Sequence, residues 1–208
     1  MKVRWRADLR VRHVHDQVTK GVRETITRVT FVFAVFLGAP ITASAEIYKL
    51  AVPTDYGFHL YWWPVLPSVV GWHHDEIASR KYATNVLVPD GYSFLNAPAI
   101  TYGEALYKPR DPEAKTVEQV ISNDRSEFER ENPGIKIKEV PELHDGDGKA
   151  LRCFSFGPAG SSGNWELVAY SEEGDDFLLF TVSALSSRAL QSADPTFSAL
   201  VSHYREKP

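Results

Sequence analysis

The sequence lacks the residues that build several common classes of site. It holds one cysteine in 208 residues, which excludes an internal disulfide framework and a cysteine-rich zinc module. Its formal net charge of -4 excludes a generally basic nucleic-acid-binding protein. Its hydrophobic content of 43% and aromatic content of 12% are nevertheless too high for a disordered chain, so we expect a folded protein.

Charge is divided unevenly along the chain. Residues 1–45 carry 8 Lys+Arg against 3 Asp+Glu, whereas residues 46–208 carry 15 against 24. Such asymmetry is typical of segments with different tasks. We therefore treat the two segments separately.

The basic segment has the three parts of a secretory signal. Arg28 precedes the apolar run Val29–Leu37, and Ala43 and Ala45 form a small-residue cleavage site. The apolar run is far shorter than the roughly 20 residues that span a bilayer. We expect residues 1–45 to be a signal peptide cut before Glu46, which leaves a periplasmic or secreted chain with no stable membrane anchor.

The charged region before the apolar run is longer than usual, at 28 residues. A translation start at Val18 or Val22 would shorten it. An amphipathic or single-pass anchor that is never cut is the alternative.

The remaining chain is long enough for one domain. Residues 46–82 are expected to be an aromatic, proline-rich lead-in that packs on an α/β domain over residues 83–208. Alternating and apolar runs predict several strands, and Trp165–Tyr170 with Phe177–Ala184 is the clearest hairpin. The lone Cys153 lies in an alternating strand and is expected to be a small buried residue.

Two helices are expected. Thr116 and Gln119 form a capping box before the first, and Pro133-Gly134 ends it. Asp194 and Pro195 fit the start of the second. Its apolar residues recur at helical spacing and form one stripe, which should pack on the hairpin. They are Phe197, Leu200, Val201 and Tyr204.

The order of these elements resembles a known group. A Val-Leu-Val-Pro-Asp-Gly strand end at residues 86–91, the Thr-capped helix, an Asp-Gly-Lys turn, the long hairpin and the final helix follow one another over residues 83–204. This order is similar to that of the PsbP/Mog1-like domains. The resemblance implies an α+β fold, a single-domain α/β/α sandwich with a largely antiparallel sheet, and a tendency to bind partners. It carries over no site residues.

Three tryptophans crowd the lead-in, namely Trp62, Trp63 and Trp72. Aromatic rings contribute much burial energy, so core packing is the first interpretation. The alternative is an exposed patch that binds a partner, a ligand or a carbohydrate.

The run His73-His74-Asp75 is the one candidate for metal ligands, because imidazole and carboxylate groups suit zinc, nickel or manganese. Adjacent residues rarely bind one ion together, and no metal-ligand spacing is present. Asp145-Gly146-Asp147-Gly148 begins like a calcium loop but has Lys149 and Phe156 where oxygen ligands are needed. We therefore expect no metal and no other cofactor.

These observations favour an exported, non-enzymatic envelope protein that binds a protein partner or a small ligand. They give no reason to expect nucleic-acid binding. A secreted metal-dependent hydrolase that uses His73 and His74 is one alternative. A carbohydrate or cell-wall binder that uses the tryptophans is another.

Overall fold

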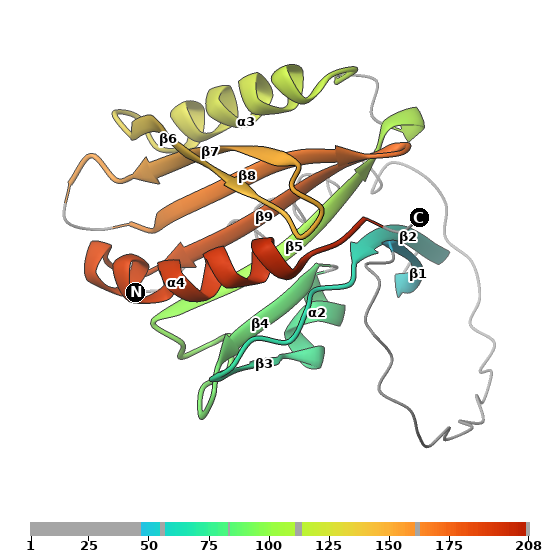
Figure 1. Ribbon diagram of the computed structural model, residues 1–208, viewed down its shortest axis with the longest axis horizontal. Coiled ribbons are helices and arrows are strands. Elements are labelled where there is room, and N and C mark those ends of the chain that lie inside the picture. Colours follow the sequence, from blue (N-terminus) through green and yellow to red (C-terminus); the bar gives the residue numbers. More distant parts are fainter. Residues whose placement is uncertain (1–46, 55–56, 83, 111–113, 161–162, 207–208) are drawn as a thin grey trace.

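The computed structural model describes residues 47–54, 57–82, 84–110, 114–160 and 163–206, and its centre is one large sheet (Figure 1). The strands lie in the order β1-β2-β5-β9-β8-β7-β6, and β4 pairs with both β3 and β5. All pairings between the described strands are antiparallel. The strands are β1 (Ile47–Thr54), β2 (Gly57–Pro64), β3 (Trp72–His74), β4 (Asn85–Pro89), β5 (Ala99–Tyr107), β6 (Lys136–His144), β7 (Ala150–Gly157), β8 (Trp165–Glu173) and β9 (Asp176–Ala184).

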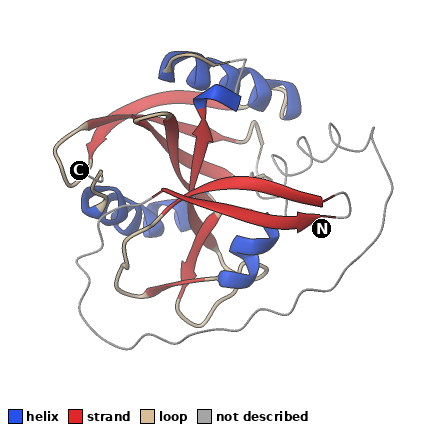
Figure 2. Ribbon diagram, turned by 90° about the vertical axis from the view of Figure 1, so that its right-hand side faces the viewer, coloured by secondary structure: helices blue, strands red, loops and turns tan. Residues whose placement is uncertain are grey.

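Helices cover both faces of this sheet (Figures 1 and 2). They are α2 (Glu76–Tyr82), α3 (Val117–Glu131) and α4 (Ser187–His203), with a short 3-10 turn η1 (Lys108–Arg110) after β5. None of the helices in the described part of the chain has both the length and the apolarity that crossing a bilayer requires.

The alternation of β9 divides the core into two layers. Leu178 and Phe180 pack in the cluster that contains the buried residues of α4. Phe177 and Leu179, which point to the opposite face, pack with buried residues of α3. A strand buried on both faces reads as a continuous apolar run, which is the pattern that this hairpin shows in the sequence.

The third helix shares a face with α3. Val86 of β4 and Tyr102 of β5 pack in one cluster with Ala78 of α2. Tyr102 lies directly opposite Thr181, and residues opposite each other point to the same face. Thr181 in turn alternates with Phe180, so α2 lies on the α3 side. The expected fold, an α+β sandwich with a largely antiparallel sheet between helices, is therefore confirmed.

The structure confirms the expected start of one helix and moves the start of the other. The Thr116 hydroxyl accepts a hydrogen bond from the Gln119 amide at 3.3 Å, and the Gln119 side chain accepts one from the Thr116 amide at 3.2 Å, which confirms the capping box. The expected start of the last helix at Asp194 is wrong. The helix begins at Ser187, because the Ser186 hydroxyl caps it by accepting from the Ala189 amide at 3.1 Å, and Pro195 lies inside it.

Residues 47–82 form more regular structure than the sequence suggested. The strand expected around the paired tryptophans is present as β2, but β1, β3 and α2 were not expected. β1 pairs with β2 along its whole length, and β2 joins the sheet where Trp62 lies opposite Ala105. This stretch therefore supplies strands to the same sheet as the rest of the chain.

Candidate functional site

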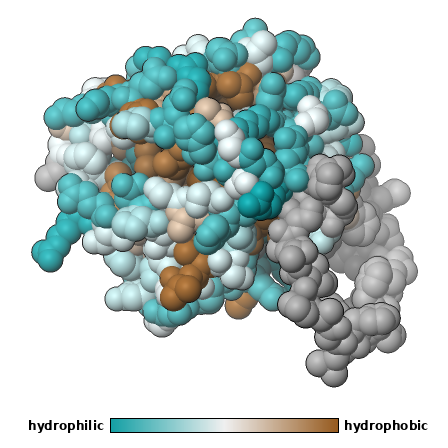
Figure 3. Space-filling model, in the orientation of Figure 1, coloured by the Kyte–Doolittle hydropathy of each residue, from teal (hydrophilic) through white to brown (hydrophobic). Residues whose placement is uncertain are grey.

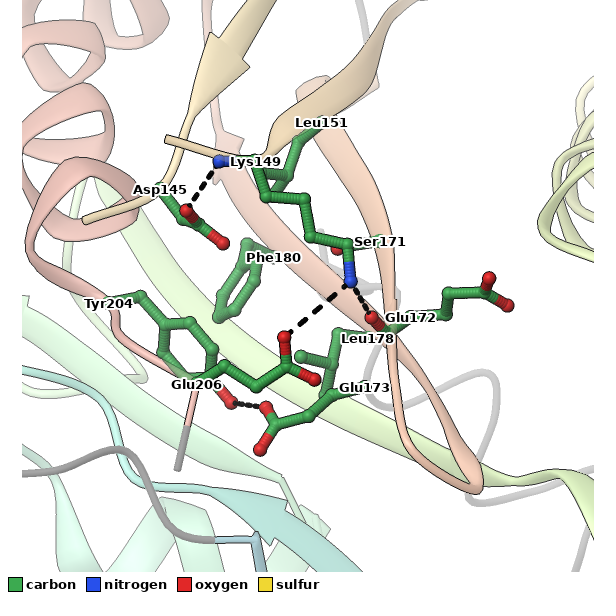
Figure 4. Close-up of a pocket in the computed structure, with 10 residues that line it drawn as sticks. All are labelled: Asp145, Lys149, Leu151, Ser171, Glu172, Glu173, Leu178, Phe180, Tyr204 and Glu206. Atoms are coloured by element: carbon green, nitrogen blue, oxygen red, sulfur yellow. Dashed lines mark hydrogen bonds and ion pairs between the residues drawn. The ribbon is translucent and has the colours of Figure 1, made fainter. Parts of the chain in front are cut away.

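A shallow hollow lies where β7, β8 and β9 meet the segment that follows α4 (Figure 4). Its apolar members come from β7 and β9, and its charged members come from β8, from the β6–β7 turn and from the end of the chain. The lining residues are Asp145, Lys149, Leu151, Ser171, Glu172, Glu173, Leu178, Phe180, Tyr204 and Glu206.

The polar groups of this hollow bind one another. The Tyr204 hydroxyl donates to the Glu173 carboxylate at 2.7 Å, and burial together with Glu173 raises the pKa of Tyr204 well above its usual value. The Lys149 ammonium contacts the carbonyl of Glu172 and lies 3.9 Å from the carboxylate of Glu206. These contacts hold the segment after α4 against the sheet.

The β6–β7 turn completes this attachment. The Asp145 carboxylate accepts from the amides of Asp147 and Lys149, both at 2.9 Å, so it shapes the turn. The Asp147 carboxylate accepts from the Arg205 guanidinium at 3.0 Å and from the Glu206 amide at 2.8 Å. Both aspartates of the sequence that resembles the start of a calcium loop therefore serve internal contacts, and we interpret the hollow as a structural joint.

The histidine run is divided between the two faces of β3. Consecutive strand residues point to opposite faces, so His73 and His74 do not converge. The His73 Nδ1 donates to the Asp90 carboxylate at 3.2 Å, and the His74 Nδ1 donates to the Asn85 side-chain oxygen at 3.0 Å. No group of three or more potential metal-binding side chains occurs within the described ranges.

Asp75, the third residue of the run, is used to build the local structure. Its carboxylate accepts from the Ala78 amide at 2.9 Å, which caps the start of α2. It also accepts from the Phe94 amide at 3.0 Å, which ties the β4–β5 loop to the helix.

The three tryptophans do not form one patch. Trp62 lies opposite Ala105, and both Ala105 and Trp72 pack with the core cluster under α4. Trp63 points to the other face, where its buried indole nitrogen has no hydrogen-bond partner among the described residues. Trp72 is half-buried against the core, and Trp62 is half-buried beside Tyr107.

The predicted signal-cleavage residues Ala43, Ala45 and Glu46 lie outside the described residues. Their role remains a prediction from the sequence.

Sequence reasoning missed a set of exposed apolar residues in the segments around β3 and β4, which we call the apolar tip. It consists of Val70, Ile77, Tyr92 and Leu95, whose exposed fractions are 98%, 83%, 46% and 82%. Apolar groups show at the lower end of the molecule in Figure 3, where the segment before β3 lies. Two of these residues adjoin turn glycines, Gly71 and Gly91, which is a local signal that an apolar residue lies outside the core.

No protein-family model and no curated protein matches this chain. Among solved structures, it is similar to the solution structure of cyanobacterial PsbP from Synechocystis sp. PCC 6803, with 11% sequence identity and a TM-score of 0.41. The similarity covers 80% of this chain and 94% of that chain.

Proposed function

We propose that the protein is an exported, non-enzymatic envelope protein that binds a protein partner through its apolar tip. Export is supported by the basic, apolar and small-residue pattern of residues 1–45. Binding is supported by the tip, which is the single observation that carries the proposal. Exposed apolar residues gathered in one place mark interaction sites on soluble proteins.

Hydrogen bonds hold the backbone of the loops that carry the tip. The Asp90 amide donates to the Gly71 carbonyl at 2.9 Å, which joins the two loops that carry Val70 and Tyr92. Below Leu95, the Ser93 amide donates to the Asn96 side chain at 2.7 Å. A preformed surface loses little conformational entropy on binding, and this favours recognition of a partner.

The loop that carries Leu95 is also tied to the helix that carries Ile77. The Phe94 amide donates to Asp75, which caps α2, and the Phe94 ring stacks on Tyr82 at 4.5 Å between ring centres. The three segments that carry the residues of the tip are thus joined to one another.

Charge favours a protein over a lipid surface as the occupant. Residues 46–208 carry 15 Lys+Arg against 24 Asp+Glu, and Glu76 and Asp90 lie beside the tip in sequence. Docking on an anionic membrane needs clusters of cations, whereas this chain carries an excess of negative charge. Aromatic and aliphatic side chains at the centre of a patch are typical of protein interfaces.

The test is site-specific photocrosslinking in the native envelope. We expect a photoreactive phenylalanine analogue at position 92 to yield one protein adduct, and the pair Ile77→Asp with Leu95→Asp to abolish it. The matched control is the same analogue in place of Tyr48 on β1. Tyr48 is also an exposed tyrosine, with an exposed fraction of 54%. It should yield no such adduct.

Three outcomes would overturn the proposal. An adduct with twice the mass of the chain would make the tip a self-association surface. A lipid adduct would make it a membrane contact. Equal crosslinking from positions 92 and 48 would show that the tip has no special role.

A further inference from the structure

The second feature of interest is a pair of cations that meet over one tryptophan. Lys49 of β1 lies directly opposite Trp62 of β2 in the hairpin register. Arg110 belongs to η1, which follows β5, and β5 is the other neighbour of β2. The β1–β2 hairpin and η1, which are distant in the sequence, therefore bring these side chains together, away from the apolar tip.

Trp62 holds both cations near its ring. It stacks on Tyr107 with 4.9 Å between ring centres and an interplanar angle of 10°. The Lys49 ammonium lies 5.6 Å from the centre of the Trp62 ring, and the Arg110 guanidinium carbon lies 5.2 Å from it. Both distances fall within the roughly 6 Å over which an aromatic ring attracts a cation.

Carboxylates balance some of the other cations on this molecule. Arg152 pairs with Glu139 at 2.8 Å, and Arg205 pairs with Asp147 at 3.0 Å. Neither Lys49 nor Arg110 forms an ion pair with any carboxylate of the described ranges. Two cations held near one ring, with no ion-pair partner in the described part of the chain, make a local site for an anion.

The residue types indicate the class of ligand. A guanidinium binds carboxylate and phosphate groups through two parallel hydrogen bonds, and an ammonium adds a point charge. The half-buried indole and phenol rings add apolar surface beside the two charges. Because the rest of the chain is acidic, a long and densely charged polyanion would be repelled, so a small ligand fits better.

We propose that Lys49, Trp62 and Arg110 form a binding site for a sugar that carries an acidic group, either a carboxylate or a phosphate. The cations bind the acidic group, and the rings contact the sugar. This site is independent of the partner surface proposed above.

The test measures binding of defined sugars to the purified protein by calorimetry. Galacturonic acid is the carboxylate probe, glucose 6-phosphate is the phosphate probe, and galactose, glucose and inorganic phosphate are the controls. We expect at least one acidic sugar to bind, with an affinity that falls as salt rises. The comparison of the two probes identifies the acidic group.

Lys49→Gln and Arg110→Gln should each weaken that binding about tenfold, because each removes a charge-assisted contact. The matched control is Lys81→Gln, since Lys81 also lies over an aromatic ring, 5.1 Å from the centre of Tyr82, but away from Trp62. It should leave the affinity unchanged. Trp62→Phe keeps an aromatic ring and should weaken binding less than either loss of charge.

The melting temperature of each variant separates loss of binding from loss of folding. Equal affinity for acidic and neutral sugars would overturn the proposal. So would a loss of affinity with Lys81→Gln as large as the loss with Lys49→Gln or Arg110→Gln. Inorganic phosphate binding as tightly as the sugars would also overturn it, because the rings would then contribute nothing.

Discussion

Cys153 shows how burial sets the chemistry of a single side chain. Its exposed fraction is 1%, and its thiol donates to the Leu151 carbonyl at 3.4 Å. Burial raises the pKa of the thiol to about 11. Since the thiolate is the reactive form, the folded protein presents almost none of it at neutral pH.

We expect a disulfide reagent to label Cys153 slowly in the native protein and rapidly after unfolding in urea. The release of the coloured thiol product measures both rates. Complete labelling of the native protein within the time taken by the unfolded chain would contradict the burial of this residue.

Asp176 is a carboxylate whose environment opposes ionisation. Its Oδ1 is buried without a hydrogen-bond partner among the described residues. Burial is the main cause that raises its pKa from 3.8 to about 6, Asp175 and Glu173 raise it further, and Lys108 acts in the opposite direction. The native state therefore binds this proton more tightly than the unfolded state does.

The contribution of Asp176 to the free energy of unfolding should fall as pH rises. With a folded pKa above the unfolded value, its contribution is present below about pH 4 and is lost between about pH 4 and pH 6. Asp176→Asn cannot ionise and should be more stable than the wild type at pH 7 by roughly 1 to 2 kcal/mol, allowing for partial exposure to solvent.

Urea denaturation of both proteins at pH 4 and pH 7 measures this difference. The advantage of Asp176→Asn should be larger at pH 7. An advantage that does not depend on pH would show that the carboxyl group titrates normally.

At the scale of elements, α4 carries much of the core on its side of the sheet. Its residues Phe197, Leu200 and Val201 are fully buried, as the apolar stripe in the sequence predicted. Leu200→Ala should destabilise the protein by about 2 to 5 kcal/mol, because it leaves a cavity between α4 and β9.

Equilibrium denaturation checks this value. Ser202 is an exposed residue of the same helix, and Ser202→Ala should change the free energy of unfolding by no more than about 0.5 kcal/mol. Equal effects of the two substitutions would mean that the stripe does not pack on the sheet.

The elements that the sequence predicted are those with strong local signals. The capping box of Thr116 and the apolar runs of the β8–β9 hairpin depend on neighbours in the chain. β3 and α2 have 3 and 7 residues, too few for a periodic pattern, and they form because β4 and the Phe94 loop pack against them.

The start of α4 and the Trp62 site are two features that the sequence alone did not predict, for a different reason. Ser186 and Asp194 are both good capping residues, and it is the structure that shows Ser186 capping the helix through the Ala189 amide. The approach of Lys49 and Arg110 to Trp62 follows from the strand order, which no pattern of single residues reveals.

At the scale of the whole molecule, export can be tested directly. We expect protein isolated from the native envelope to begin at Glu46, because Ala43 and Ala45 suit the pocket of a signal peptidase. Mass spectrometry of the intact protein identifies the first residue. Replacing both alanines with leucine should block processing, and an N-terminus upstream of Val29 on cytosolic protein would contradict export.

The central pairing of the sheet has a consequence for how fast the chain folds. β5 and β9 pair along their whole lengths, yet Tyr102 and its partner Thr181 lie far apart in the sequence. The pairing that joins the two halves of the sheet therefore closes a long loop, and the entropy cost of this closure comes before the stabilising contacts form. Folds of this kind form slowly, in about milliseconds to seconds. The export proposed above requires a chain that is still unfolded when it reaches a membrane channel, and slow closure of this pairing favours that state.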